Sequence, residues 1–238
     1  MTLDYLNTSL GDIARSIPGA TRVLHEHRLD FCCNGHVTLA EAANRKHIDA
    51  EALAAQLKTL QAAGDATEKD WRQESPSVLI NHILERYHDA HREQLPELIR
   101  LARRVEQVHG RRPNCPNGLA DHLNNMQQEL ESHMLKEETI LFPMLIEGQQ
   151  SEAAGPISVM RFEHEQHGES LDELIRLTND ITPPADACNT WQALYRGLEE
   201  FRQDLMQHIH LENNILFAFS PRITDTPADS CCSVCSGN

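Results

Sequence analysis

The sequence predicts an all-α protein in which a small N-terminal helical domain precedes an antiparallel four-helix bundle. Residues that favour helices (Ala, Leu, Glu, Gln and Arg) dominate the composition, and aromatic residues make up only 5% of the chain. Four long helical patterns follow one another in the C-terminal part, separated by breaks rich in Gly, Pro and Asn. The second pair of these helices repeats residues of the first pair, which indicates two helical hairpins related by a pseudo-twofold axis.

Composition divides the chain into four parts. Residues 1–62 hold short helical patterns (LGDIARSI, GATRVLHEH, TLAEAANR and DAEALAAQLKTLQ), with a Cys-Cys loop between the second and the third. Residues 63–77 are polar and typical of a linker. Residues 78–220 are expected to form the bundle, whose breaks are HGRRPNCPNG, EGQQSEAAGP and NDITPPADACNT. Residues 221–238 lack an apolar period and are expected to form a flexible Cys-containing tail.

Charge and apolar patterning exclude several classes of partner. The net charge of −15 at pH 7 argues against nucleic acid or an anionic membrane as the main partner. No apolar run approaches the roughly 20 residues that a membrane span needs, and the first residues lack the pattern of a signal peptide. Seven irregularly placed cysteines do not form a disulfide framework and are better interpreted as thiols or metal ligands. We therefore expect a cytoplasmic protein.

The duplication has a constant spacing in each half. The first helix, YHDAHREQLPELIRL from Tyr87, matches the third, EHEQHGESLDELIRL from Glu163, 76 positions later. The second helix contains HMLKEETILF from His133, and the fourth contains HIHLENNILF from His208, 75 positions later. Both of these segments follow the pattern His-x3-Glu-x2-Ile-Leu-Phe. The repeated residues are therefore expected to meet near the pseudo-twofold axis of the bundle.

The repeated His-x3-Glu pattern predicts a buried metal site. Residues four apart lie on one face of a helix, about one turn apart, and the apolar Ile-Leu-Phe continues that face toward the interior. A buried Glu beside a buried His is costly unless a cation compensates both. Symmetry adds one His from each of the other two helices. The predicted ligands are His88, His133, Glu137, His164, His208 and Glu212.

This donor set favours two metal ions over one. Four imidazoles and two carboxylates, without a thiolate, suit iron or manganese. Sharing six ligands across a pseudo-twofold axis favours two ions bridged by both carboxylates, with room for an oxo or hydroxo bridge and one exchangeable position. A ferritin-like site is rejected, because Glu85-x2-His88 fits its pattern once but the counterpart of Glu85 is Arg161. Which two His serve which ion is left open, since two pairings satisfy the symmetry.

The bundle with these ligands resembles hemerythrin-like di-iron domains. Over about residues 8–219 the chain also resembles the repair-of-iron-centres family (the YtfE/ScdA/DnrN type), on the segments LDFCCNGHVTLAEAA and GPISVMRFEHE. The resemblance implies a non-haem di-iron centre on the same six residues, and a stress protein that repairs iron–sulfur clusters damaged by nitric oxide or oxidants. It implies damaged or apo iron–sulfur proteins and nitric oxide as partners, and dimerisation into a homodimer.

The cysteines are secondary candidates. The resemblance implies that Cys32 and Cys33 mark the N-terminal domain and control access to the bundle or exchange NO and iron; the alternative is two small buried hydrophobic residues. The family usually has Cys-Cys-Gly-Gly, and Asn34 departs from it, although Asn tolerates the left-handed backbone. Three tail thiols either capture iron in transit or have no role. These tail residues are Cys231, Cys232 and Cys235.

Several polar residues lie close to the predicted ligands in sequence. Glu163 precedes a ligand, and Glu129 and Asp204 each lie one turn before another. A metal-bound His commonly donates its second N–H to a carboxylate, so these three are candidates for accepting that N–H from the ligand histidines or for an iron exit, with plain surface charge as the alternative. His91 and His167 are related by the duplication and are expected to border the site without coordinating.

Four functions compete. The first is cluster repair by releasing iron, in which reduction to the ferrous state lowers the charge that the carboxylate bridges hold. The second is binding or scavenging of NO, or its reduction to nitrous oxide, so whether the protein is an enzyme stays open. Oxygen carriage is less favoured, because four His are fewer than the five usual in such carriers. The last is a structural bundle without a metal. The sequence gives neither the clients nor the electron donor.

Overall fold

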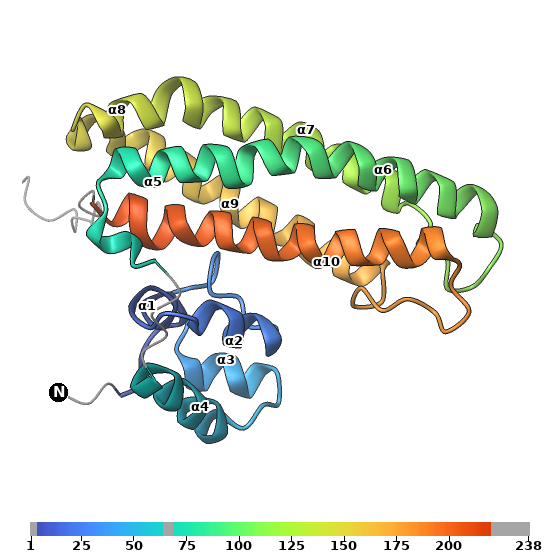
Figure 1. Ribbon diagram of the computed structural model, residues 1–238, viewed down its shortest axis with the longest axis horizontal. Helices are drawn as coiled ribbons and strands as arrows, with labels where there is room; N and C mark the ends of the chain where they lie inside the picture. The colour runs from blue at the N-terminus through green and yellow to red at the C-terminus, as the bar shows by residue number, and fades with distance from the viewer. Residues whose placement is uncertain (1–3, 64–68, 220–238) are drawn as a thin grey trace, which may run out of the picture.

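The computed structural model describes residues 4–63 and 69–219. These residues form helices and loops, with one isolated β-bridge between Ser9 and Thr38, which confirms the predicted all-α class. A small helical unit lies against one side of an elongated bundle of long helices (Figure 1). Within the described ranges, no helix combines the length and the apolar character that a membrane span requires.

The N-terminal unit is built from four helices, and side chains cap the first and the third of them at their starts. The Ser9 hydroxyl accepts a hydrogen bond from the backbone N–H of Asp12, and Thr38 forms a reciprocal capping box with Glu41. Gly19, at φ 79°, supplies the left-handed residue that precedes the second helix. The helices are α1 (Leu10–Ser16), α2 (Ala20–Glu26), α3 (Leu39–Arg45) and α4 (Ala50–Ala63).

The long helices run side by side and are joined by short loops, so neighbours along the chain are antiparallel (Figure 1). A 3₁₀ turn, η1 (Trp71–Gln73), precedes them. Ser75 caps the first with Pro76 at its first position. The first long helix consists of α5 (Pro76–Ile83), η2 (Leu84–His88) and α6 (Asp89–His109), and the second consists of α7 (Leu119–Lys136), η3 (Glu137–Leu141) and α8 (Phe142–Ile146). The third is α9 (Gln150–Leu177). The fourth consists of α10 (Asn189–His210), η4 (Leu211–Ile215) and η5 (Leu216–Phe219).

Three of the four long helices contain a wide π-helical turn. These turns are η2, η3 and η4, and each contains a predicted ligand: His88, Glu137 and Glu212 respectively. The third long helix, α9, is regular through His164. π-turns are rare and concentrate at functional sites, and here they lie at the same level of the bundle.

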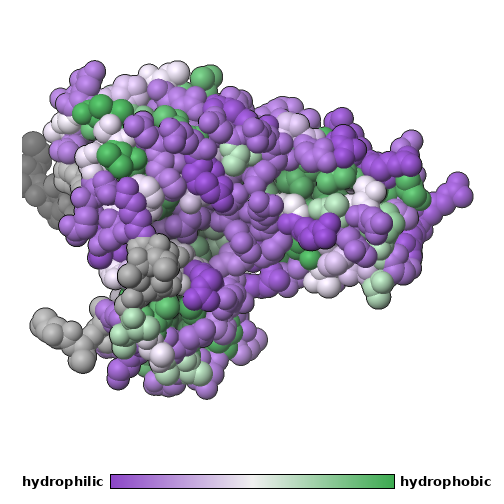
Figure 2. All heavy atoms as spheres, viewed as in Figure 1, coloured by the Kyte–Doolittle hydropathy of each residue, from purple (hydrophilic) through white to green (hydrophobic). Residues whose placement is uncertain are grey.

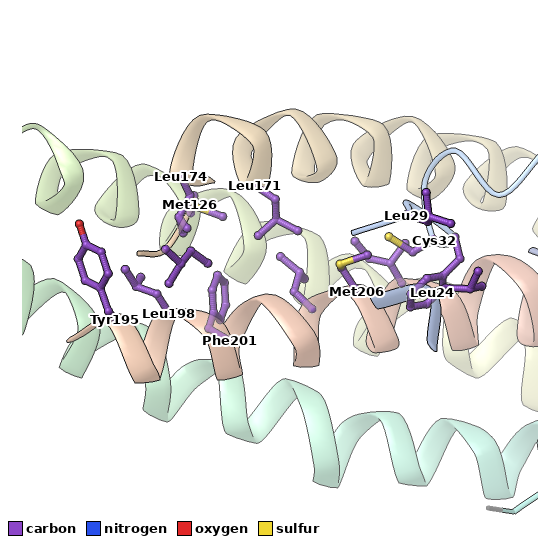
Figure 3. Close-up of a cluster of buried hydrophobic side chains, with 14 of the residues drawn as sticks. Leu24, Leu29, Cys32, Met126, Leu171, Leu174, Tyr195, Leu198, Phe201 and Met206 are labelled. Atoms are coloured by element: carbon purple, nitrogen blue, oxygen red, sulfur yellow. The ribbon is translucent and has the colours of Figure 1, made fainter. Parts of the chain in front are cut away.

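Two hydrophobic clusters fill the interior. The larger extends along the bundle and into the N-terminal unit: in Figure 3, Leu24, Leu29 and Cys32 of that unit lie close to Met206 of α10, while Phe201 lies further along. The smaller joins α5, α8, α9 and the last turns of the chain that are described. Along every long helix, the predicted ligands separate residues of one cluster from residues of the other. The predicted ligands therefore form a polar layer between two apolar cores.

The surface in the view of Figure 2 is mostly hydrophilic, with scattered apolar residues. This agrees with the acidic composition and its net charge of −15 at pH 7. Among residues 4–63 and 69–219, the large apolar side chains that are exposed include those of Val78, Val108, Leu135, Ile140, Ile146, Val159 and Phe162.

Candidate metal centre

The four long helices bring all six predicted ligands together in one buried layer. Every one of them is at most 1% exposed. His88 comes from the first helix, His133 and Glu137 from the second, His164 from the third, and His208 and Glu212 from the fourth.

The four histidines form two pairs. The Nε2 atom of His88 lies 3.1 Å from Nε2 of His208, and Nε2 of His133 lies 3.1 Å from Nε2 of His164. The first helix is therefore paired with the fourth, and the second with the third. The structure thereby selects between the two pairings that the sequence left open.

Each glutamate presents one oxygen to each histidine pair. Glu137 Oε2 lies 3.5 Å from His88 Nε2, and its Oε1 lies 3.4 Å from His133 Nε2. Glu212 places Oε1 3.1 Å from His208 Nε2 and Oε2 3.1 Å from His164 Nε2. The donors form two groups of two imidazoles and two carboxylates, each group with its ligand atoms within 4.8 Å of one another and both groups sharing the two glutamates.

The glutamate oxygens that lack hydrogen-bond donors indicate that the layer is suited to hold cations. Both carboxylate oxygens of Glu137 and Oε2 of Glu212 are buried without a hydrogen-bond donor. A buried carboxylate in that condition is strongly destabilising. Two cations, one in each group, would satisfy these oxygens and the four Nε2 atoms at once. Imidazole and carboxylate donors without a thiolate fit iron.

Burial also shifts the pKa values of several of these ligand side chains. It lowers the pKa of His88 to about 2 and that of His133 to about 4, so both imidazoles are neutral near pH 7. Burial and the adjacent Glu212 raise the pKa of Glu137 well above its usual range. Burial would raise the pKa of Glu212 as well, but its contacts with His208 and His164 lower it. The two carboxyls therefore differ in pKa, with that of Glu137 the higher.

Loading the site is expected to release a proton from Glu137, whose pKa is raised by burial and by Glu212. Metal ligands must be deprotonated, and His88 and His133 are already neutral near pH 7. Calorimetric titration with Fe²⁺ under anaerobic conditions, in buffers of different ionisation enthalpy, measures the proton count. Metal binding without any proton release would contradict the raised pKa of Glu137.

Two ligand histidines are held by carboxylates on their other ring nitrogen. His88 Nδ1 lies 2.8 Å from Glu138 Oε1, and His133 Nδ1 lies 2.9 Å from Glu163 Oε2. An N–H donated from Nδ1 leaves Nε2 as the free donor atom for a metal. Each carboxylate is in turn held by a cation. These cations are Arg92 beside Glu138 and Lys136 beside Glu163.

The other two ligand histidines differ from each other. His164 Nδ1 lies 3.0 Å from Oδ1 of Asn213, whereas His208 Nδ1 is buried without a hydrogen-bond partner. Tyr87, the counterpart of Glu163 in the duplication, stacks its ring on that of His208 at 5.7 Å between centroids and 3° between planes. The pseudo-twofold symmetry of the ligands does not extend to their supports.

Glu138 and Asn213 were not predicted from the sequence, although a signal for them exists. Each directly follows a ligand glutamate, and they are 75 positions apart, which is the spacing of the repeat. One of them is an acid and the other an amide. A search for identical residues at the repeat spacing overlooks this pair, because a glutamate aligns with an asparagine. The two side chains are nevertheless chemically similar, since each has an oxygen that accepts an N–H.

The predicted supporting acids have three different surroundings. Glu163 contacts His133, as described above. Glu129 lines, together with Glu163, a cavity of about 580 Å³ between α7 and α9. The carboxylate of Asp204 instead contacts Arg86 at 2.6 Å and Gln94 at 2.9 Å, and its described contacts include no ligand histidine.

His91 and His167 border the layer without belonging to either donor group. The ring of His91 lies 5.3 Å from that of His208, and the ring of His167 lies 4.9 Å from that of His133. Both rings are buried, and the Nε2 atom of each has no hydrogen-bond partner.

The Cys-Cys loop lies directly against the layer. Cys33 Sγ donates to the backbone oxygen of His164 at 3.2 Å, and the two thiols are free, with sulfurs 3.5 Å apart. A hydrogen bond with Cys33 and burial raise the pKa of Cys32 well above its usual range. The Asp30 carboxylate accepts from the backbone N–H groups of both cysteines. Cys231, Cys232 and Cys235 lie outside the described residues.

The departure from the family pattern at Asn34 has a different explanation from the one expected. Asn34 does not adopt a left-handed backbone conformation. Its side-chain amide donates to Asp30 at 2.7 Å, and its backbone N–H donates to the same carboxylate. The side chain of Asn34 therefore closes the loop, and backbone freedom is not required there.

Replacing Glu138 with Ala is expected to weaken metal binding by about 10- to 100-fold, because His88 loses the acceptor that fixes its ring. Competition with a chelator measures the affinity. Glu131→Ala is the matched control, since Glu131 pairs with the same Arg92 at 2.9 Å and contacts no ligand. Equal losses in the two variants would assign the effect to Arg92 instead.

Comparison with known proteins covers both parts of the chain. Residues 79–220 match the family described as the hemerythrin HHE cation binding domain, and residues 6–61 match ScdA_N, a domain of unknown function. The iron–sulfur cluster repair protein YtfE of Yersinia pestis (strain Pestoides F) is 54% identical over 215 residues, which cover 90% of this chain and 97% of that protein. YtfE of Yersinia pseudotuberculosis (serotype O:1b, strain IP 31758) matches with the same identity and coverage.

Proposed function

Because the chain belongs to the family of YtfE iron–sulfur cluster repair proteins, with a hemerythrin HHE domain that binds cations, we propose that it holds two iron ions and releases them to rebuild damaged clusters. One observation supports this most directly: two histidine pairs share two glutamates, and each glutamate offers one oxygen to each pair. The same six residues would hold both ions.

The binding strength of this layer depends on charge. The layer contains the two carboxylates of Glu137 and Glu212, so its attraction for a cation grows with the charge of the cation. Ferric ions are therefore held more tightly than ferrous ions. Reduction of the bound iron lowers its charge and favours departure, which makes the iron a cargo that is retained or released according to its redox state.

The exit for this cargo is the acidic cavity between α7 and α9. Glu163 belongs both to the support of His133 and to the wall of the cavity, whose wall also contains Glu129. The same wall contains the carboxylates of Glu169 and Glu173, and also Lys136. Its carboxylates would attract a cation that leaves the His133–His164 pair.

The partners follow from this role. Damaged or metal-free iron–sulfur proteins would receive the iron, and nitric oxide would be the agent that damages them. The cytoplasm is the proposed location, and a homodimer is the proposed assembly. The net charge of −15 at pH 7 disfavours nucleic acid and anionic membranes as partners.

The experiment that tests the proposal measures iron per chain, by elemental analysis, before and after the reduced protein meets a metal-free iron–sulfur enzyme. A loss of iron from this chain together with recovered activity of the acceptor supports a donor role. Iron that stays bound while the acceptor stays inactive contradicts donation. A chain that takes up no iron contradicts the site itself.

A second candidate is the binding of nitric oxide, or its reduction to nitrous oxide, at the same centre. The observation that favours it is access: cavities of about 280 and 550 Å³ are both lined by Cys32 and Cys33, whose loop contacts His164. Stopped-flow spectra of the ferrous protein mixed with NO, with headspace analysis for nitrous oxide, test this candidate. An unchanged spectrum would exclude it.

A further inference from the structure

Asn213 joins a predicted metal ligand to the Cys-Cys loop of the other domain. It follows Glu212 in η4 and is 8% exposed. Its Oδ1 atom lies 3.0 Å from His164 Nδ1, and its Nδ2 atom donates to the backbone oxygen of Cys32 at 3.1 Å. A single amide thus contacts the ligand ring with one end and the loop with the other.

A second contact closes a ring of interactions between the same partners. Cys33 Sγ donates to the backbone oxygen of His164 at 3.2 Å. The loop therefore contacts His164 twice, at its backbone directly and at its imidazole through Asn213. Asp30 keeps the loop compact by accepting from the N–H groups of Cys32 and Cys33, so a displacement at one cysteine is transmitted to the other.

The orientation of the Asn213 amide depends on which nitrogen of His164 carries the proton. When a metal occupies Nε2, the proton must lie on Nδ1. The ring then donates, so the amide oxygen must face it and the amide NH₂ must face the Cys32 carbonyl, as observed. Both ends of the amide are then satisfied.

Without a metal, the other tautomer of His164 becomes available. Its Nε2 atom has two acceptors nearby, Glu212 Oε2 at 3.1 Å and His133 Nε2 at 3.1 Å. A proton on Nε2 makes Nδ1 an acceptor, which requires the amide NH₂ of Asn213 to face the ring. The amide oxygen would then face the Cys32 carbonyl oxygen, so the bond to the loop is lost.

We propose that Asn213 is a positioning residue that couples metal occupancy at His164 to the closure of the Cys32–Cys33 loop. This proposal depends on the proposed function in one respect, which is that a metal ion must bind at His164. Binding free energies couple reciprocally, so displacing the loop weakens retention of the ion held by the His133–His164 pair. The His88–His208 pair has no such link to the loop among the described contacts.

The neighbouring residue supplies a matched control. Asn214 also donates to the same loop, from Nδ2 to the Phe31 backbone oxygen at 3.1 Å, and it contacts His210 at 2.9 Å. His210 is not one of the six ligands. Asn214→Ala therefore removes one loop hydrogen bond without touching a ligand, whereas Asn213→Ala removes one loop hydrogen bond and one ligand contact.

The experiment measures how fast iodoacetamide alkylates Cys33 in the full chain, resolved from Cys32 by tandem mass spectrometry. The chain is compared metal-free and loaded anaerobically with Fe²⁺, with the iron content determined in each sample. Loading is expected to slow alkylation about fivefold or more, the lower end of typical coupling between sites. Asn213→Ala abolishes that difference, and Asn214→Ala keeps it.

The variant Asn213→Asp shows whether a loss of coupling can occur without misfolding of the chain. Aspartate still offers an oxygen to His164 Nδ1 but places another oxygen against the Cys32 carbonyl, so this variant keeps its iron and loses the protection of Cys33. Removal of iron by a chelator gives a second readout: Asn213→Ala is expected to accelerate loss of one of the two ions and leave the other unchanged.

The outcomes distinguish the two proposals. Full iron loading with equal alkylation rates in the unaltered chain overturns the coupling and leaves the di-iron site intact. Protection that survives in Asn213→Ala, or that is lost equally in Asn214→Ala, also overturns it. A chain that binds no iron overturns both the coupling and the proposed function.

Discussion

Replacing both Glu137 and Glu212 with Ala is expected to lower the bound iron from about two ions per chain to about none, because metal affinity depends on the charge and number of the donors. Each carboxylate offers an oxygen to both histidine pairs, so removing the two together takes half of the donors from each group. The remaining imidazoles offer only two donor atoms to each ion. Elemental analysis after loading and dialysis measures the result.

The matched control replaces two other glutamates, with Glu85→Ala and Glu165→Ala combined. Both are exposed, and they lie in the first and third long helices beside ligand histidines. This variant has the same change in net charge and should keep two ions. Iron retained by the Glu137/Glu212 double variant would show that the imidazoles suffice, and the bridging arrangement would then be wrong.

The architecture was predictable because each helix carries its own signal. The breaks between the long helices contain Gly, Pro and Asn, and the repeat with its spacing of 75 or 76 positions indicates a pseudo-twofold axis. His133 and Glu137 lie four residues apart, so any helical geometry places them on nearly one face. Six residues selected in this way do lie together in the structure.

The pairing of the histidines could not be predicted, because it depends on how far each helix is rotated about its axis. A rotation that the repeat permits would have paired His88 with a different partner. The π-turns η2, η3 and η4 could not be predicted for the same reason. They adjust the angular position of residues around ligands, and no residue pattern in the segments distinguishes a π-turn from an α-turn.

The supports of the histidines were only partly predictable, because they combine residues of different kinds and of different domains. Glu163 was a candidate, since it adjoins a ligand and carries a carboxylate. Asn213 has a role that depends on where the Cys32–Cys33 loop is placed, and that placement comes from packing of the N-terminal unit on α10, where Leu24 and Leu29 approach Met206 (Figure 3). Such contacts between distant segments have no local signature.

Replacing Glu137 with Leu is expected to raise the free energy of unfolding of the metal-free protein by about 1–4 kcal/mol, although it removes a metal ligand. Neither oxygen of Glu137 has a hydrogen-bond donor in the buried layer. Burial and the nearby Glu212 raise its pKa, which means that the folded state disfavours its charge. Leucine fills a similar volume without that cost. Urea unfolding after treatment with a chelator measures the change.

The gain should depend on pH in a defined direction. Because the pKa of Glu137 is higher in the folded than in the unfolded chain, the folded state binds more protons above the usual pKa of a glutamate. The contribution of Glu137 to the stability of the metal-free protein therefore falls as pH rises from about 4.3, and the advantage of Glu137→Leu is larger at pH 7 than at pH 4. An advantage that shrinks toward pH 7 would contradict the raised pKa.

The metal-loaded proteins should show the opposite order, since a ligand that binds only the folded state stabilises it by mass action. Excess Fe²⁺ is expected to raise the unfolding midpoint of the unaltered chain far more than that of Glu137→Leu. Glu165→Leu, at an exposed position of α9, serves as the control and should respond to iron as the unaltered chain does. If Glu137→Leu gained as much from iron, the cation would be held without Glu137. A reversed order with and without iron would show that this layer is arranged for the cation at the expense of the metal-free fold.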